Sequence, residues 1–161
     1  MNGKSAEHSR VIMTELVLPN DTNQLGNLLG GRLMHWIDIA AALAAQRHSG
    51  KVCVTASVDE ISFHEPIKLG HVVHINAIVT RTFRTSMEIQ VEVEREDPLH
   101  DSRAHTSSAF LTFVAIDQYG KPLPAPPLIP ETPEEQVRYE QAAIRREARL
   151  SERKAVEERG G

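Results

Sequence analysis

The sequence predicts an α+β domain in which an antiparallel β-sheet wraps around one long central helix. Within the first 121 residues, one stretch, residues 30–48, has the length and the Leu, Met and Ala content of an α-helix. From residue 52 to residue 116, apolar residues recur with the period of two that is typical of β-strands. One strand precedes the helix and four follow it through mostly short turns, and a sheet curled around the helix satisfies that order.

The first two elements have clear sequence boundaries. A strand over residues 11–18 ends at the turn-forming cluster Pro19-Asn20-Asp21. Three glycines crowd into residues 26–31, the predicted helix follows, and Gly50 provides a stop. Apolar residues lie on most sides of this helix, which predicts that it is buried. They are Leu33, Met34, Ile37, Ile39, Ala40, Ala41, Leu43 and Ala44.

Four strands are predicted after the helix, over residues 52–59, 71–81, 86–95 and 107–116. The third is the clearest, because its apolar residues alternate with glutamate and glutamine, so one face should be buried and the other solvated. The last strand is apolar on both faces, as expected of a more central strand. One helix cannot cover all of these positions, so the pattern favours assembly through the sheet, most simply as a two-fold dimer.

The compact domain is expected to span residues 1–121. Residues 122–133 hold six of the nine prolines and predict an extended linker, because proline lacks the amide donor and the free φ of helix interiors and central strands. Residues 134–161 are rich in both acids and bases and sparse in apolar residues. They predict a charged, solvated helix or a partly disordered tail, with a partner-binding helix as the alternative.

Length and composition exclude several classes of protein. The 161 residues correspond to one domain, and the net charge of −4 without an extended basic patch argues against nucleic acid as a partner. A single cysteine, Cys53, excludes a disulfide framework, and the histidines show no metal-ligand spacing, so no metal is expected. The longest apolar run, residues 39–45, is far short of the roughly 20 residues of a membrane span. No secretory signal is visible, so a cytoplasmic location is expected.

Asp38 is the first candidate for chemistry. It lies between Ile37 and Ile39 in the middle of the most apolar helix. An unpaired buried carboxylate costs on the order of several kcal/mol, so the site must supply a partner, water or a raised pKa. Such an environment suits a general base or a nucleophile. The alternative is a structural carboxylate that reaches a polar gap or pairs with His35.

Gly30 and Gly31 open the predicted helix and are the second candidate. Paired glycines let a ligand approach the backbone, and unpaired N–H groups favour negative charge, whether on a thioester or ester oxyanion or on a phosphate. The segment matches neither a Walker loop nor a dinucleotide fingerprint. A role in helix packing is the alternative. By residue type alone, Asn23 in the turn and Thr55 on a strand are more typical of structural roles.

Three segments of the chain carry a family resemblance: LPNDTNQLGNLLGGRLMHWIDIAAALAA, VTASVDEISFHEPIKLGHVV and TSMEIQVEVE. Their combination of a proline–Asx turn, a double glycine, a helix aspartate and F-x-x-P-I-x-x-G is specific, although each piece alone is weak. Over about residues 10–118 the chain resembles the hotdog-fold acyl-CoA thioesterase (acyl-CoA hydrolase) family. Two departures could alter the acyl or CoA contacts: Leu28-Leu29 replaces a frequent aromatic before the glycines, and His71 replaces a frequent aspartate after Gly70.

The resemblance implies a homodimer whose two sheets pair edge to edge, and often a trimer of dimers, which is a hexamer. It implies an active site between two subunits, with Asn23 from one and Asp38 and Thr55 from the other. Asp38 would attack the thioester carbonyl or activate water, and Asn23 would position the carbonyl or the water. Thr55 would orient the carboxylate or water, and the N–H groups of Gly30 and Gly31 would polarise the carbonyl.

The same resemblance implies that acyl-CoA is the substrate. Coenzyme A is then part of substrate and product, and no separate cofactor is expected. Its phosphates would need polar and cationic groups at the dimer edge, for which Arg81, Arg84 and Ser86 are the candidates.

Two other functions compete with thioester hydrolysis. One is a non-catalytic acyl-CoA-binding sensor or assembly module. The complete set of Asn23, Asp38 and Thr55 argues against it, and no helix-turn-helix segment is attached to bind DNA. The other is hydratase chemistry on acyl thioesters, in which His35 and Asp38 would form a catalytic pair.

Overall fold

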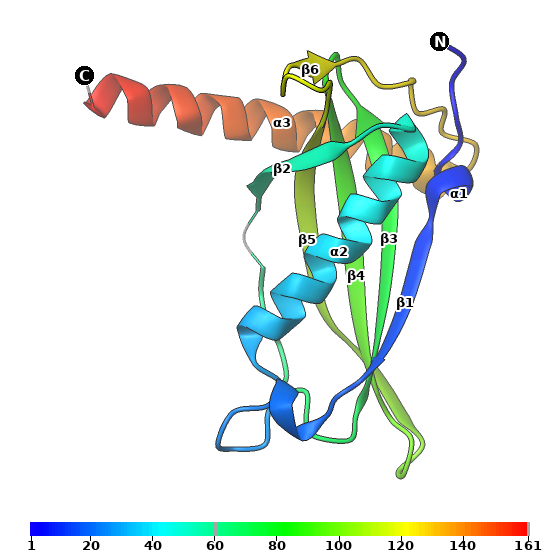
Figure 1. Cartoon of the computed structure of the whole chain (residues 1–161), viewed down its shortest axis with the longest axis vertical. Helices are drawn as coiled ribbons and strands as arrows, with labels where there is room; N and C mark the ends of the chain where they lie inside the picture. The colour runs from blue at the N-terminus through cyan, green and yellow to red at the C-terminus, as the bar shows by residue number, and fades with distance from the viewer. Residues whose placement is uncertain (60, 161) are drawn as a thin grey trace.

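A computed structural model describes residues 1–59 and 61–160; residues 60 and 161, which belong to the expected domain and tail, lie outside the described part. One antiparallel sheet forms the body, in the order β1-β3-β4-β5-β2, with β6 paired to the end of β5. The strands are β1 (Val11–Leu16), β2 (Cys53–Val58), β3 (Val72–Thr82), β4 (Ser86–Asp97), β5 (Ser102–Ile116) and β6 (Pro122–Leu123). The sheet curls around one long helix, α2 (Gly30–Ser49), which confirms the predicted fold class (Figure 1). Two short helices, α1 (Ala6–Ser9) and η1 (Pro19–Asp21), flank β1.

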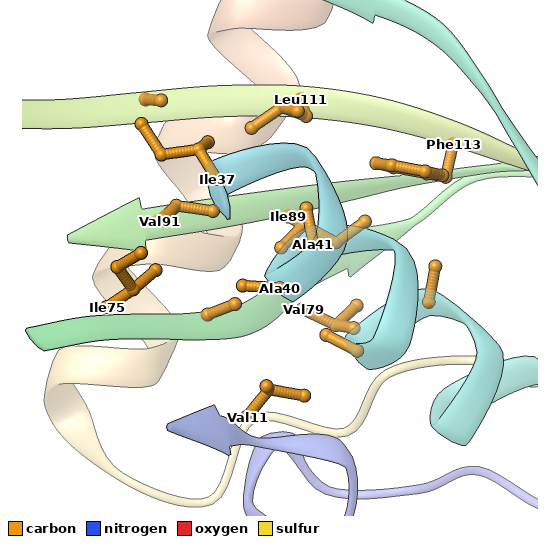
Figure 2. Packing of buried hydrophobic residues seen from close by; sticks show 14 of the residues in the cluster. Val11, Ile37, Ala40, Ala41, Ile75, Val79, Ile89, Val91, Leu111 and Phe113 are labelled. Carbon is orange, nitrogen blue, oxygen red and sulfur yellow. The ribbon is translucent and has the colours of Figure 1, made fainter. Parts of the chain in front are cut away.

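The central helix packs one of its sides against the sheet. It ends at Gly50, whose φ of 69° is in the left-handed region that glycine adopts without strain. Ile37 and Ala41 are fully buried among strand residues (Figure 2). The prediction that the helix is buried on most sides is wrong for one side, where Ile39 and Leu43 remain 36% and 37% exposed. The sheet of one chain covers only the side of α2 that faces it.

The strands follow the predicted alternation except at one edge. The apolar residues of β4 that face α2 are fully buried; they are Met87, Ile89, Val91 and Val93. β5 lies between β4 and β2, as its two apolar faces predict. β2 departs from its pattern, since Val54 and Val58 are more than 40% exposed although the alternation predicts a buried face. The reason is that β2 is the last strand of the sheet, and among the described residues no element lies beyond it.

The proline-rich segment packs against the domain. Residues 122–123 form β6 on β5, and Ala125 and Leu128 are buried. At the end of α2, His48 is fully buried, and its Nε2 lies 2.7 Å from the carbonyl oxygen of Pro126. The segment is extended, as its prolines predict, but it is held by these contacts. The division of the chain into domain, linker and tail stays a prediction.

The C-terminal helix, α3 (Pro133–Gly160), lies on the face of the sheet opposite α2 (Figure 1). The helical form of the tail is therefore confirmed, but its full solvation is wrong, because Ala142 is buried and Arg145 reaches Glu88 on β4. The alternation of β4 predicts a solvated Glu88, yet this side chain is 0% exposed because α3 covers it. No helix in the described part of the chain is long and apolar enough to cross a bilayer.

Candidate active site

Asp38 and Thr55 form the best-defined pair of the predicted site. Asp38 lies near the middle of α2 and is partly buried, and Thr55 lies on the edge strand β2. Thr55 Oγ1 donates a hydrogen bond of 2.9 Å to Asp38 Oδ1. Thr55, rather than His35, is therefore the partner of this carboxylate in the described structure. One oxygen is held by the hydroxyl, and Oδ2 accepts no hydrogen bond from the described residues.

The two elements that carry this pair also leave apolar side chains exposed. Ile39 follows Asp38 and Val54 precedes Thr55, and both are exposed, as are Leu43 and Val58 further along the same elements. The apolar patterns of α2 and β2 predict that these side chains are buried, but in a single chain they remain exposed. Exposed apolar surface of this kind, bordered by polar groups, is typical of a surface that another protein covers.

Asn23 is positioned by its own turn. Its Oδ1 accepts hydrogen bonds from the backbone N–H groups of Leu25 and Asn27, at 2.9 Å and 3.2 Å. These bonds hold the side chain in an Asx turn, the structural role that its residue type indicates. They use only the carbonyl oxygen, so the amide Nδ2 has no acceptor among the described residues and stays available as a donor. A structural and a functional role of Asn23 are therefore compatible.

The two glycines form the first turn of α2. Leu29, the residue before them, provides no side-chain cap, so the first N–H groups of the helix lack the usual side-chain acceptor. A Cβ built on Gly30 or on Gly31 would meet no atom within 4 Å beyond its chain neighbours and the adjacent backbone of its own helix. Close packing inside the chain therefore does not require glycine here. Open space beside the helix start is what a ligand approaching these N–H groups would need.

A cleft of about 370 Å³ opens beside this helix start. Asn23 and Gly30 line it together with Leu33 and, from the loop before β3, Phe63 and His64. Phe63 and His64 were not among the predicted site residues, although both belong to the F-x-x-P-I-x-x-G motif, which is a sequence signal for this loop. The walls of the cleft are mainly apolar, as expected of a site for an acyl group.

The structure of one chain does not bring all predicted site residues together. Asp38 and Thr55 do not line the cleft that contains Asn23. From Gly30 to Asp38 the helix rises about 12 Å, at ~1.5 Å per residue. Within one subunit, therefore, the N–H groups at the start of α2, which could stabilise an oxyanion, are separated along the helix from the carboxylate of Asp38.

The three candidates for binding the phosphates of coenzyme A have different surroundings. Arg81 donates from Nη1 to the carbonyl oxygen of Tyr139 at 3.1 Å, and its guanidinium lies over the Tyr139 ring at 4.0 Å. Arg84 is exposed in the turn between β3 and β4, and Ser86 begins β4. Arg81 thus already has a structural partner on α3, whereas Arg84 and Ser86 remain accessible candidates.

Cys53 is a half-buried thiol whose surroundings disfavour a nucleophilic role. It lies at the start of β2 and makes a contact of 3.3 Å between its Sγ and Ser49 Oγ. Burial raises the pKa of the Cys53 thiol above its ordinary value, which disfavours the reactive thiolate. The interpretation of Cys53 as a small hydrophobic residue agrees with this environment.

Comparisons with known proteins agree with the fold. The model of the thioesterase superfamily matches residues 25–100. The uncharacterized acyl-CoA thioester hydrolase YkhA of Bacillus subtilis is 39% identical over 148 residues, which cover 92% of this chain and 86% of that protein. The chain also matches longer mammalian thioesterases, of which it spans only 24% to 37%.

Solved structures extend the agreement to three dimensions. An apo-hexameric acyl-CoA thioesterase is 42% identical with a TM-score of 0.91, over 94% of this chain and 97% of that chain. An acyl-CoA hydrolase from Staphylococcus aureus, in complex with butyryl-CoA, CoA and CoA disulfide, is 35% identical with a TM-score of 0.89, over 96% and 94% of the two chains. Structures of that hydrolase include variants in which an aspartate, an asparagine or a threonine is replaced by alanine. The chain belongs to the hotdog-fold family of acyl-CoA thioester hydrolases.

Proposed function

We propose that this chain hydrolyses the thioester of acyl-CoA to a free acid and coenzyme A, with Asp38 as the general base or the nucleophile. The observation that carries the proposal is the hydrogen bond from Thr55 to Asp38, a partly buried carboxylate on a helix that leaves Ile39 and Leu43 exposed. The S. aureus hydrolase variants replace an aspartate, an asparagine and a threonine, which are the residue types of this site. That coincidence supports the choice of residues.

Either role of Asp38 gives a balanced reaction. As a base, its carboxylate takes a proton from water while the water oxygen bonds to the carbonyl carbon, and the C–S bond then breaks as the thiolate accepts a proton. As a nucleophile, a carboxylate oxygen bonds to the carbonyl carbon, the thiolate leaves, and water hydrolyses the resulting anhydride. The hydrogen bond from Thr55 orients the carboxylate in both cases.

The carbonyl oxygen gains negative charge in both routes. The N–H groups at the start of α2, next to Gly30 and Gly31, would stabilise it, and the helix dipole adds to their effect. Asn23 Nδ2 would donate to the same carbonyl or to the attacking water, because its Oδ1 is already used within the turn.

A complete site needs two copies of the chain, with Asn23 from one subunit and Asp38 and Thr55 from its partner. Two observations support this arrangement. The helix start and the carboxylate are about 12 Å apart along α2 at ~1.5 Å per residue. Both α2 and β2 expose apolar residues that a second copy would cover, among them Ile39 and Val54. A homodimer, further assembled into a trimer of dimers, is the proposed form; two of the similar solved structures are described as hexameric.

The non-catalytic acyl-CoA-binding module is not favoured, because the named relatives are hydrolases. Thiol release from acyl-CoAs of short, medium and long chain length tests catalysis directly. Asp38→Ala and Asn23→Ala should each reduce turnover by about 100-fold or more, the usual scale for a lost acid–base or oxyanion group. Undiminished turnover by Asp38→Ala would exclude the mechanism.

Mixing the two inactive variants tests the shared site. When Asn23→Ala and Asp38→Ala subunits are unfolded and refolded together, mixed dimers contain one site with both native residues. Activity should return to roughly a quarter of the wild-type value, since about half of the dimers are mixed and each has one intact site of two. A mixture that stays inactive, while each variant retains the native oligomer size, would place all three residues in one subunit.

A further inference from the structure

α3 crosses the outer face of the sheet, the face opposite α2, one strand after another. Its first contacts reach β3, its middle reaches β4, and its later part reaches Asp59, the residue after β2. This path follows the order of the strands in the sheet, β3-β4-β5-β2 (Figure 1). The contacts that mark the path are Tyr139 with Arg81, Arg145 with Glu88 and Arg149 with Asp59.

The helix does not end where the sheet ends. Arg153 lines one cleft together with Ala56 and Ser57 of β2, so α3 lies over the edge strand at this point. Residues 154–160, which we call the overhang, then extend about 10 Å further at ~1.5 Å per residue. Figure 1 shows this end of α3, in red, projecting past β2. Within the described part of the chain, the overhang makes no hydrogen bond or ion pair with another element.

One apolar residue of the overhang is on the side of α3 that faces the sheet. That side is marked by Ala142, which is fully buried, and by Arg145 and Arg149, which reach the sheet. Val156 follows Arg149 by seven residues, or about two helical turns, and so continues the same side. It is nonetheless 66% exposed, because the described sheet ends at β2. Ile144 is as exposed, at 69%, but it lies about 200° around the helix from Ala142, toward solvent.

The position of the overhang matches the place of a second subunit. In the proposed dimer, Thr55 on β2 completes a site with the partner's Asn23, so the partner lies at this edge of the sheet. Neighbouring strands are about 4.8 Å apart, and an overhang of about 10 Å therefore reaches across the β2 strand of the second copy. With both α2 helices on one face of the joined sheet, both α3 helices lie on the other face.

The second copy offers an apolar surface at this place. Val54 pairs with Val114, which lines the cleft beneath α3, so Val54 is on the outer face of the sheet as well. It is 44% exposed in one chain. We propose that the overhang crosses to the partner subunit and packs on the outer face of its β2, with Val156 against the copy of Val54. This inference rests on the dimer of the proposed function, and it adds α3 to the elements that hold the dimer together.

Two-fold symmetry makes the contact reciprocal, since each subunit gives one overhang and receives one. The symmetry axis passes between the two β2 strands, about 2.4 Å from each, and so near the start of the overhang. The two α3 helices pass this axis side by side in opposite directions, at the ~8–10 Å of packed helices. The two copies of Ala155 are then close together. The two copies of Gln136, about 28 Å back along each helix at ~1.5 Å per residue, are on opposite sides of the dimer.

Cross-linking of single cysteines tests this arrangement. Ala155→Cys and Gln136→Cys are each made in a Cys53→Ala chain, and Gln136 is the control position because it is exposed on the same helix. A short bismaleimide should join most Ala155→Cys chains into covalent dimers and leave Gln136→Cys chains unjoined. Any hexamers formed by the joined chains should still release dimers on dilution. Joined hexamers that release no dimers would place the overhang against a neighbouring dimer, which would overturn the proposal.

Dissociation of the dimer tests the apolar contact. Val156→Glu should raise the concentration at which dimers release monomers by at least about tenfold, because a carboxylate takes the place of the apolar side chain on the partner's sheet. Ile144→Glu is the matched control, since it makes a similar change at nearly equal exposure on the solvent side of α3. It should change that concentration less than about threefold. Sedimentation on dilution measures both variants, and equal effects would contradict the contact.

Neither experiment needs turnover, so each result is separate from thiol release. A chain that sediments as a dimer while its Ala155→Cys variant stays unjoined overturns the overhang contact alone and leaves the proposed function standing. A wild-type chain that is monomeric contradicts the shared site of the proposed function and the overhang contact with it. An inactive dimer whose Ala155→Cys chains are joined supports the contact and counts only against the proposed function.

Discussion

Glu88 on β4 and Arg145 on α3 form a two-point ion pair: Arg145 Nη2 lies 2.7 Å from Glu88 Oε1, and Nε lies 3.0 Å from Oε2. Thr80 also donates to Glu88 Oε1, at 2.6 Å. Glu88 is fully buried, so these bonds compensate the loss of its hydration. The pair holds the C-terminal helix on the outer face of the sheet.

Removing one partner of this pair should destabilise the fold more than removing both. Arg145→Met leaves the Glu88 carboxylate buried and without its cation, which should lower the free energy of unfolding by about 3 kcal/mol. The double variant Glu88→Met/Arg145→Met replaces both charges with apolar side chains and should recover most of that loss. Urea unfolding of the two variants and the wild type measures the difference. Equal losses in the single and double variants would show that the ion pair is not coupled.

The hydrogen bond from Thr55 to Asp38 should affect catalysis more than folding. Thr55→Val keeps the side-chain volume and removes the donor, so kcat/KM should fall roughly 10- to 100-fold, the scale of a hydrogen bond to a charged group. Thr55→Ser retains the hydroxyl and should recover at least half of the lost activity on a logarithmic scale. Steady-state thiol release is the measurement, with thermal unfolding as the control. Equal activity of the valine and serine variants would contradict a role for the hydroxyl.

Substitution of Gly31 should lower activity without lowering stability. Beyond its chain neighbours and the adjacent backbone of its own helix, a Cβ at this position meets no atom within 4 Å, and alanine is favoured over glycine in helices by about 1 kcal/mol. Gly31→Ala should therefore leave the unfolding free energy unchanged or raise it. Activity should fall at least tenfold, because the added methyl group occupies the space from which a thioester carbonyl would approach the backbone. If the variant is both stable and fully active, a backbone oxyanion site at Gly31 is excluded.

The buried His48 makes stability depend on pH. Burial lowers the pKa of His48 below its ordinary value of 6.5, against the raising effect of its bond to Pro126. Below pH 6.5 the unfolded chain binds a proton that the folded chain resists, so stability is complete above that pH and is lost as the pH falls. The slope from this one group is at most about 1.4 kcal/mol per pH unit.

Comparison with His48→Gln isolates this effect, because His71 also has a pKa lowered by burial and remains in both proteins. Urea unfolding at pH 7.5 and pH 5.5 should show a larger loss of stability in the wild type than in the variant. The same loss in both proteins would assign the pH dependence to other groups.

The sequence by itself determined the fold class and the identity of the site candidates. Period-two alternation after a single apolar helix specifies a sheet with one face on that helix, because successive strand side chains point to opposite faces. The glycine pair, Asn23, Asp38 and Thr55 could be named because they stand in unusual local settings or match a family motif. The structure adds that Thr55 and Asp38 are in direct contact.

Only the tertiary structure decided which element covers each face. Alternation states that Glu88 and Ile89 point in opposite directions, but Glu88 is buried because α3, more than forty residues later, lies over it. Likewise, the pattern of β2 predicts burial that its place at the edge of the sheet does not supply. Local periodicity predicts the direction in which a side chain points from its own backbone. The environment of that side chain depends on distant segments of the chain and, in the proposed dimer, on a second copy.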